Sequence, residues 1–322
     1  DASSTAIYGS RGANGVVMIT TKRGKEGKTT VDYNGYIGVS QLRKKLDLLE
    51  KDDYIAMVNE VSVNEGNGIL ITPEQAALLP NNDWQDLAYQ TALTHSHQFS
   101  VSGGNDKTKV YSSLNYMNQE GIIKGSNYNR FALRINGDQK ITDKISLNAS
   151  VAYSYGTQNT ANSNADGYGA IAYTAMVMPP IQEIKDEYGN YTVFSGTPWG
   201  GTNPVGMAEL YKNQNINSRL LANLSLSWDI IEGLNFRVNA GAEVVASESD
   251  RYIPIGLSAG GQLDGDASKS KSNYYTLINE SILTYNKTFN DIHALNVMGG
   301  ITFQSYEYNS LSGSGTGFLR DV

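Results

Sequence analysis

Two short motifs carry acidic or imidazole side chains that could bind a metal ion. His95 and His97 form an H-x-H pair, which in a strand would place both imidazoles on one face, as a two-ligand metal clip requires. No carboxylate or third histidine lies close in sequence, so we interpret the pair as ordinary polar residues at a loop end. Asp264 and Asp266 flank a glycine as in a calcium loop, but no Glu stands at the twelfth position of that pattern. A surface turn explains them better, and we predict neither a metal site nor a cofactor.

The glycine-rich segment GSRGANG, residues 9–15, could cradle a phosphate through its backbone. It lacks the Gly-Lys-Ser/Thr ending of a Walker loop and the strand-to-helix setting of a dinucleotide fingerprint, which argues against nucleotide binding. No Gly-x-Ser-x-Gly elbow is present, and three scattered histidines do not make a Ser-His-acid triad. The sequence therefore gives no positive support for an enzyme.

Large aromatic side chains gather in one long segment that lacks a strand pattern. They are Tyr168, Tyr173, Tyr191 and Trp199. Such side chains stack on sugar rings or pack against a peptide or another protein, and they are equally suited to packing within their own loop. We predict that they form a binding surface, with internal packing as the alternative.

The elements that position these side chains are strands of alternating polarity. From Lys144 onward, apolar and polar residues alternate, with one face formed by Ile145, Leu147, Ala149, Val151, Tyr153 and Tyr155. The same alternation recurs at 130–138, 219–229 and 234–244, and more weakly at 30–40, 98–102, 109–118, 273–287 and 293–308. About nine strands result, most of them about ten residues long, which is the length a tilted strand needs to cross a bilayer.

The connections between these strands alternate in length. Tight polar turns lie at 103–107, 142–144, 231–233 and 290–291, and long connections lie at 41–94, 119–127, 157–215 and 247–272. Short turns on one side and long loops on the other are typical of an outer-membrane barrel, with the long loops extracellular. Helical patterns at 51–66 and 82–91, the second beginning with an Asn/Asp cap, predict short helices within the first long loop.

The two faces of such a barrel wall would meet different solvents. We expect lipid to contact Leu147, Val151, Leu224, Phe236 and Val238. The polar face fits a hydrated lumen, or alternatively the solvent face of an ordinary sheet, and carries Arg134, Asn136, Asn148, Arg219, Asn223, Arg237, Asn239 and Glu243. Four aromatic residues near strand ends fit an interfacial girdle, although Tyr and Trp favour strands anywhere. They are Tyr153, Tyr155, Trp228 and Tyr285.

The composition excludes several classes of protein. Against 25 Lys and Arg stand 32 Asp and Glu, a net charge of −7, which argues against binding nucleic acid. No cysteine is present, which excludes disulfides and thiolate metal sites and is compatible with export. No run of about 18 apolar residues exists, so a membrane role would need strands. The sequence opens at Asp1, and we expect it to be part of a longer protein.

The opening residues 1–24 read DASSTAIYGSRGANGVVMITTKRG. This segment resembles the end of the plug domain of SusC/RagA-type TonB-dependent outer-membrane transporters, and its motif includes Tyr8, Gly9, Gly12, Asn14 and Gly15. The resemblance continues through VDYNGYIGVS, DYIAMVNE, HQFSVSGG, NRFALRIN and LTYNKTF. It implies that residues 1–24 end a plug domain and that residues 25–322 form the N-terminal part of a transmembrane antiparallel β-barrel. Arg11, Lys22 or Arg23 could then pair with inward Glu243 or Asp138, or form a solvated basic turn.

The resemblance also implies a function in the outer membrane. Transporters of this family import bulky nutrients, usually oligosaccharides or peptides, with a SusD-like surface lipoprotein as the lid. The TonB complex supplies energy through an N-terminal region outside this sequence. The loop aromatics would then contact substrate or lid. A rival interpretation is an extracellular all-β ligand-binding or adhesion domain, which would be soluble without detergent.

Overall fold

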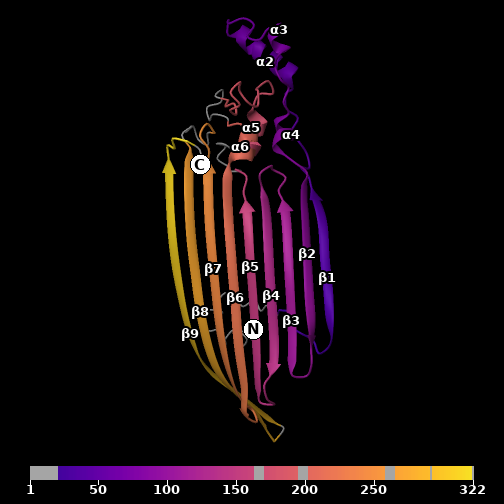
Figure 1. The fold of residues 1–322 in the computed structure, drawn as a ribbon, viewed down its shortest axis with the longest axis vertical. Coiled ribbons are helices and arrows are strands. Elements are labelled where there is room, and N and C mark those ends of the chain that lie inside the picture. Colours follow the sequence, from indigo (N-terminus) through magenta and orange to yellow (C-terminus); the bar gives the residue numbers. More distant parts are fainter. Residues whose placement is uncertain (1–20, 163–169, 195–201, 258–264, 291, 321–322) are drawn as a thin grey trace.

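The computed structural model describes residues 21–162, 170–194, 202–257, 265–290 and 292–320. Within these residues, nine strands form one antiparallel sheet in which each strand pairs with its neighbours in sequence (Figure 1). The strands are β1 (Gly27–Ser40), β2 (Ala92–Gly104), β3 (Thr108–Glu120), β4 (Asn127–Lys140), β5 (Ile145–Asn159), β6 (Lys212–Ile231), β7 (Leu234–Ile253), β8 (Asp266–Phe289) and β9 (His293–Thr316). The predicted all-β architecture is confirmed.

The pairing register joins the alternating strands into two continuous faces. Val151 of β5 pairs with Ala222 of β6, which pairs with Ala242 of β7. Because side chains alternate along every strand, this register gathers the apolar positions of all these strands on one side. The predicted lipid-facing and lumen-facing sets thus lie on opposite faces. We refer to the first as the outward face and to the second as the inner face.

Strands β6 to β9 are 20 to 24 residues long. They extend into the ranges predicted as long loops, so the loops predicted at 157–215 and 247–272 are longer than the observed ones. The observed connections are residues 160–211 and 254–265. Beyond Ala246 the next four residues are polar on both faces, so the alternation disappears although backbone pairing continues to Ile253. Hydrogen bonding between strands, which leaves no periodic pattern in sequence, sets the real strand ends.

The connections follow the predicted arrangement by length, with short turns at one end of the sheet and long loops at the other (Figure 1). The turn between β6 and β7 shows how sequence fixes a short one. Gly233 has φ +82°, and a Cβ there would lie 2.3 Å from the Asn286 carbonyl oxygen. Only glycine satisfies both conditions.

All helices in the described ranges lie in the long connections. They are α2 (Lys51–Asn64), α3 (Pro73–Ala76), α4 (Trp84–Ala88), α5 (Ile171–Val177) and α6 (Pro204–Leu210). The predicted helices at 51–66 and 82–91 are confirmed, and Asp83 caps α4 by accepting from the backbone N–H groups of Gln85 and Asp86. None of the helices in the described part of the chain has the length and hydropathy needed to span a membrane. Figure 1 shows α2 and α3 projecting beyond the sheet, whereas α4, α5 and α6 lie close to the strand ends.

The hydrophobic core of the described residues lies under the helices rather than between two sheets. Trp84 of α4, Ile171 and Ala175 of α5, and Met207 of α6 pack with Leu257 and are almost fully buried. Ile253 at the end of β7 joins this cluster and links it to the sheet. The sheet therefore serves as a wall, and the helix cluster formed by α4, α5 and α6 sits at one end of it.

Candidate functional site

The helix cluster ties together the two longest connections of the chain. The indole Nε1–H of Trp84 donates to the Pro179 carbonyl oxygen at 2.8 Å. Asn82 makes two bonds to the same partner loop, from its backbone N–H to the Pro180 oxygen and from its side-chain amide to the Gln182 oxygen, both 2.8 Å. These bonds hold residues 41–91 against residues 160–211, so the two loops form one surface.

Asn203 positions α6 within that surface. Its side-chain oxygen accepts from the backbone N–H groups of Val205 and Gly206, and its amide donates to the Ile184 oxygen at 2.9 Å. A Cβ on Gly206 would lie 2.6 Å from the ring of Tyr191. Glycine at this position therefore permits the close approach of α6 to the segment before it.

Two of the four predicted binding aromatics lie in the described residues, and Tyr191 is engaged in packing. Its ring contacts the helix cluster, its hydroxyl donates to the Glu209 carboxylate, and the Lys185 ammonium lies 4.5 Å from the ring centroid. Burial and the bond to Glu209 raise the pKa of Tyr191. Tyr173 lies half-buried on α5.

Among the described aromatics of this loop, the most accessible is one that sequence reasoning missed. Tyr188 is 82% exposed at the tip of a turn. Asp186 builds the turn by accepting from the backbone N–H groups of Tyr188 and Asn190, and Gly189 adopts φ +85° within it. The sequence DEYGNY carries this turn chemistry and could have identified the exposed position.

The remaining predicted site residues lie outside the described residues. These are Tyr168 and Trp199 of the loop and the plug-end motif Tyr8, Gly9, Gly12, Asn14 and Gly15.

The inner face is polar and carries paired charges. The Arg219 guanidinium lies 2.6 Å from the Glu243 carboxylate, so Glu243 pairs with β6 and not with Lys22 or Arg23, while Arg11 lies outside the described residues. Asp266 at the start of β8 pairs with Arg251 of β7, so it lies in a strand rather than in the predicted turn. No interaction of Arg134 or Arg237 with another described side chain is observed. This face therefore offers guanidinium donors to a polar solute.

The segment Thr21–Gly24 is fastened to the inner face. The Asn136 amide donates to the Lys22 carbonyl oxygen at 2.6 Å and to the Thr21 hydroxyl at 3.3 Å, and Asn136 itself is fully buried. Of the alternatives that the sequence left open for this segment, the ion pair of Arg23 with Asp138 is formed, at 2.5 Å. A Cβ on Gly24 would lie 2.4 Å from the Val110 nitrogen, which shows how closely the chain follows the wall. The side of the sheet that carries the polar set is thus the one that holds the N-terminal segment.

The outward face has the dimensions of a bilayer-spanning wall. Ile145 pairs with Trp228 near the short turns, and Tyr155 pairs with Phe131 toward the loops, ten residues further along β5. At a rise of about 3.3 Å per residue and a strand tilt of about 40°, this separation is about 25 Å across a membrane. Aromatic rows therefore bracket an apolar band of the expected height.

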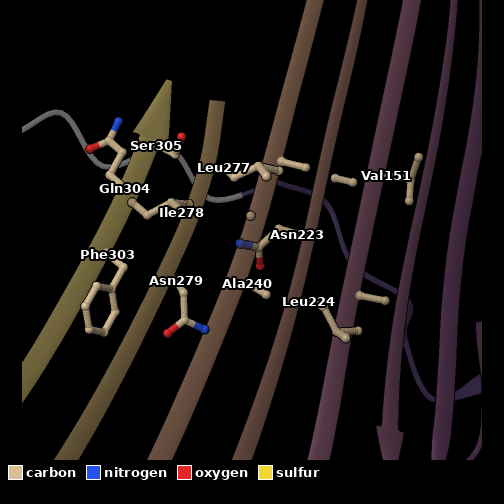
Figure 2. Close-up of a pocket in the computed structure, with 14 residues that line it drawn as sticks. Val151, Asn223, Leu224, Ala240, Leu277, Ile278, Asn279, Phe303, Gln304 and Ser305 are labelled. Atoms are coloured by element: carbon tan, nitrogen blue, oxygen red, sulfur yellow. The ribbon is translucent and has the colours of Figure 1, made fainter. Parts of the chain in front are cut away.

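A shallow depression of about 660 Å³ lies within this band (Figure 2). Its floor is formed by small residues of β5, β6 and β7, namely Ala149, Ala222, Ala240 and Ala242. Leu224, Leu277 and Phe303 rise around it, as Figure 2 shows. Since its lining is mostly apolar and it opens sideways from the wall, the depression matches lipid tails rather than a polar solute.

His95 and His97 lie inside β2, not at a loop end as predicted. Both are on the outward face, where the His97 ring stacks with Tyr33 and the His95 ring lies tilted against His97 and Tyr116. The Tyr33 hydroxyl lies 2.7 Å from His97 Nδ1. The prediction placed the boundary of β2 too late because His and Ser break the apolar pattern there.

Comparison with known proteins shows similarity to TonB-dependent receptors. No family model matches it. It is 31% identical to TonB-dependent receptor P3 of Formosa agariphila over 312 residues, which is 95% of this chain and 30% of that receptor. It is 35% identical to TonB-dependent receptor SusC of Bacteroides thetaiotaomicron over 237 residues, 68% of this chain and 23% of that receptor. The chain thus spans less than a third of the length of these relatives.

Solved structures share the fold. The RagAB peptide importer in its open-open state matches with a TM-score of 0.77 and 22% identity, over 99% of this chain and 39% of that one. A second structure, of the RagAB peptide transporter, matches with a TM-score of 0.76 and 20% identity, over 98% and 39% of the two chains. At these sequence identities, the similarity to the solved structures shows a shared fold and nothing more.

Proposed function

Because the chain belongs to the SusC/RagA type of TonB-dependent receptors, we propose that its protein takes up a bulky nutrient across the outer membrane. The observation that carries the proposal is the two-faced wall: an outward apolar band about 25 Å high, bracketed by aromatics, opposite an inner face of amides and guanidinium groups. A hydrated path along that inner face would suit an oligosaccharide or a peptide, since both present many hydrogen-bonding groups.

We assign residues 1–24 to the end of a plug domain and residues 25–322 to the barrel wall. The bonds from Asn136 and Asp138 to the segment Thr21–Gly24 support this division, because they hold the N-terminal segment on the inner face. Energy from the TonB complex would act on the plug. The fastening at Asn136 would keep the end of the plug attached to the wall while the rest moves.

A SusD-like surface lipoprotein is the proposed lid. Support comes from the coupling of the two longest loops into one surface, which would offer a lid a single rigid seat. Tyr173 and the exposed Tyr188 are the proposed contact residues in the described part of that surface, with Tyr168 and Trp199 as further candidates from sequence. Tyr191 supports the surface from within, because its hydroxyl and ring are already engaged.

The proposal is tested in the full-length receptor, expressed with its neighbouring lipoprotein. One variant deletes residues 195–201, which removes Trp199 and spares Asn203, the cap of α6. The other is Tyr188→Ala. We expect each to weaken uptake or lid association about tenfold, the effect of losing an aromatic contact worth roughly 1.4 kcal/mol. Barrel assembly, followed by heat-modifiable migration on a gel, should not change.

The matched control is Ile292→Ala, which alters a residue 77% exposed in the short turn between β8 and β9, at the end of the sheet away from the long loops. Unchanged uptake and unchanged lid association in both test variants would refute the assignment of the loop aromatics. Extraction addresses the function class itself. Recovery of the full-length protein from membranes by salt or buffer alone, without detergent, would favour the rival adhesion domain.

A further inference from the structure

A second cavity, of about 550 Å³, lies where α6 meets the loop ends of β5 to β8. Its polar lining includes Asn159, Glu209, Lys212, Gln214 and Asp250, and part of its wall is formed by Tyr211 and Tyr252. The volume is within the range of about 300 to 1,000 Å³ that is usual for small-molecule sites. None of the functions assigned above uses this cavity.

The strand register places the cavity on the outward face, beyond the apolar band. Asn159 pairs with Gln214, and Gln214 pairs with Asp250, in one row across β5, β6 and β7. The row through Tyr153, Leu220 and Val244 lies six residues away on each strand, an even number, so both rows share a face. The cavity is therefore separate from the inner path and stands level with the membrane surface on the loop side.

The side chains of this row are held by one another and keep free groups for a ligand. The Asn159 amide donates to Asn127 at 3.1 Å, and Asn159 in turn accepts from Gln214 Nε2 at 3.2 Å. Asp250 Oδ2 pairs with the Lys269 ammonium at 2.9 Å. Within the described residues, Gln214 Oε1, Asp250 Oδ1 and the Lys212 ammonium have no partner. A fixed amide, a carboxylate oxygen and an ammonium side by side suit vicinal hydroxyl groups, each of which both donates and accepts.

The balance of charged side chains in the lining of the cavity argues against an anion as its ligand. Glu209 and Asp250 outnumber Lys212 in the lining, and Lys269 only neutralises Asp250. Phosphate sites instead rely on excess positive charge or clustered donors. The half-buried Tyr211 adds apolar area, which sugar rings use and phosphate does not.

We propose that this outward cavity binds a neutral saccharide unit of one or two sugars at the membrane surface. The sugar could belong to the head group of a surface glycolipid or to a free oligosaccharide, and the recognition chemistry is the same. The glycolipid has the advantage of position, because the strand register places the cavity directly beyond the lipid-facing band.

The test measures binding to the purified full-length receptor in detergent by saturation-transfer NMR and calorimetry. The probes are maltose, a lipopolysaccharide with neutral core sugars in micelles, and inorganic phosphate. The variant Gln214→Leu keeps the side-chain size and removes the amide, and Asp250→Asn serves as a second variant should the first fail to assemble. The matched control, Asn118→Leu, removes an amide from the outward face of β3, outside the lining of the cavity.

We expect at least one sugar probe to bind, with about a tenfold loss of affinity in Gln214→Leu or Asp250→Asn and no loss in Asn118→Leu. Binding of maltose alone identifies a free saccharide as the source, and binding of the lipopolysaccharide alone identifies a glycolipid. Absence of binding by both sugar probes would overturn the proposal. So would equal losses in test and control variants, or phosphate binding that depends on Gln214.

Discussion

An arginine placed at Leu224 should strongly destabilise the receptor, and the sheet register gives the magnitude. Leu224 pairs with Ala149, four residues along β5 from the lower aromatic row at Ile145. With a rise of about 3.3 Å per residue and a tilt of about 40°, this is about 10 Å into a band about 25 Å high. Leu224 is therefore within about 3 Å of the bilayer midplane, where an outward Arg costs about 2 to 4 kcal/mol.

The depression beside Leu224 does not relieve this cost. It has room for a long side chain, but the polar residues in its lining are the uncharged Asn223, Asn279, Gln304 and Ser305, none of which is a counter-ion. The guanidinium would thus remain unpaired in hydrocarbon. A loss of about 2 to 4 kcal/mol lowers the folding equilibrium constant by about 30-fold to nearly 1,000-fold.

The assay is denaturant unfolding of the full-length receptor reconstituted in lipid vesicles. Two controls share the strand and the new side chain. Ser225→Arg alters the next residue, which points to the inner face, and should cost far less than Leu224→Arg. Ser218→Arg lies in the upper aromatic row with Tyr155, where Arg costs about 0 to 1 kcal/mol. Equal losses in Leu224→Arg and Ser225→Arg would refute the assignment of the outward face to lipid.

Three further outcomes are expected in the full-length receptor. Trp84→Ala should destabilise the helix cluster locally by about 3 to 5 kcal/mol, because the residue is 3% exposed, and limited proteolysis should cut the first long loop faster while the barrel stays assembled. Asn136→Leu removes the donor to the Lys22 carbonyl oxygen, so hydrogen exchange at residues 21–24 should accelerate, and unchanged exchange would argue against the fastening. Burial and the bond to Glu209 raise the pKa of Tyr191, so its contribution to loop docking is complete below pH about 10, the unfolded pKa, and is lost as pH rises through the folded value. Absorbance titration should show a late-ionising tyrosine that is missing in Tyr191→Phe.

The two faces of the sheet were largely predictable because the alternation of polarity that reports them is local in sequence. A strand exposes alternate residues to two different solvents, so the polarity of Leu147, Asn148 and Ala149 already reports the face on which each lies. The boundaries of the strands were not predictable to the same degree. Where both faces meet water, as at residues 247–250, the alternation vanishes although the backbone remains paired.

The residues of the candidate site show more clearly what could not be predicted from the sequence. Sequence reasoning named Tyr191 as a binding aromatic and missed Tyr188, yet Tyr191 is engaged by Glu209 and Tyr188 is exposed. The pair Arg23 and Asp138 was one of several that charge alone allowed, and only packing selected it. Which of several possible partners a residue contacts depends on where segments that are distant in sequence meet.

By itself the sequence determined the fold class, the two faces and the alternation of short and long connections, because each rests on a period of two or on turn chemistry within a few residues. The tertiary structure alone decided how strands register and which loops dock. Asn136 meets Lys22 across 114 residues of chain, and Trp84 meets Pro179 across 95. Contacts at such separations depend on the three-dimensional path of the whole sheet, and no local pattern of residue types encodes them.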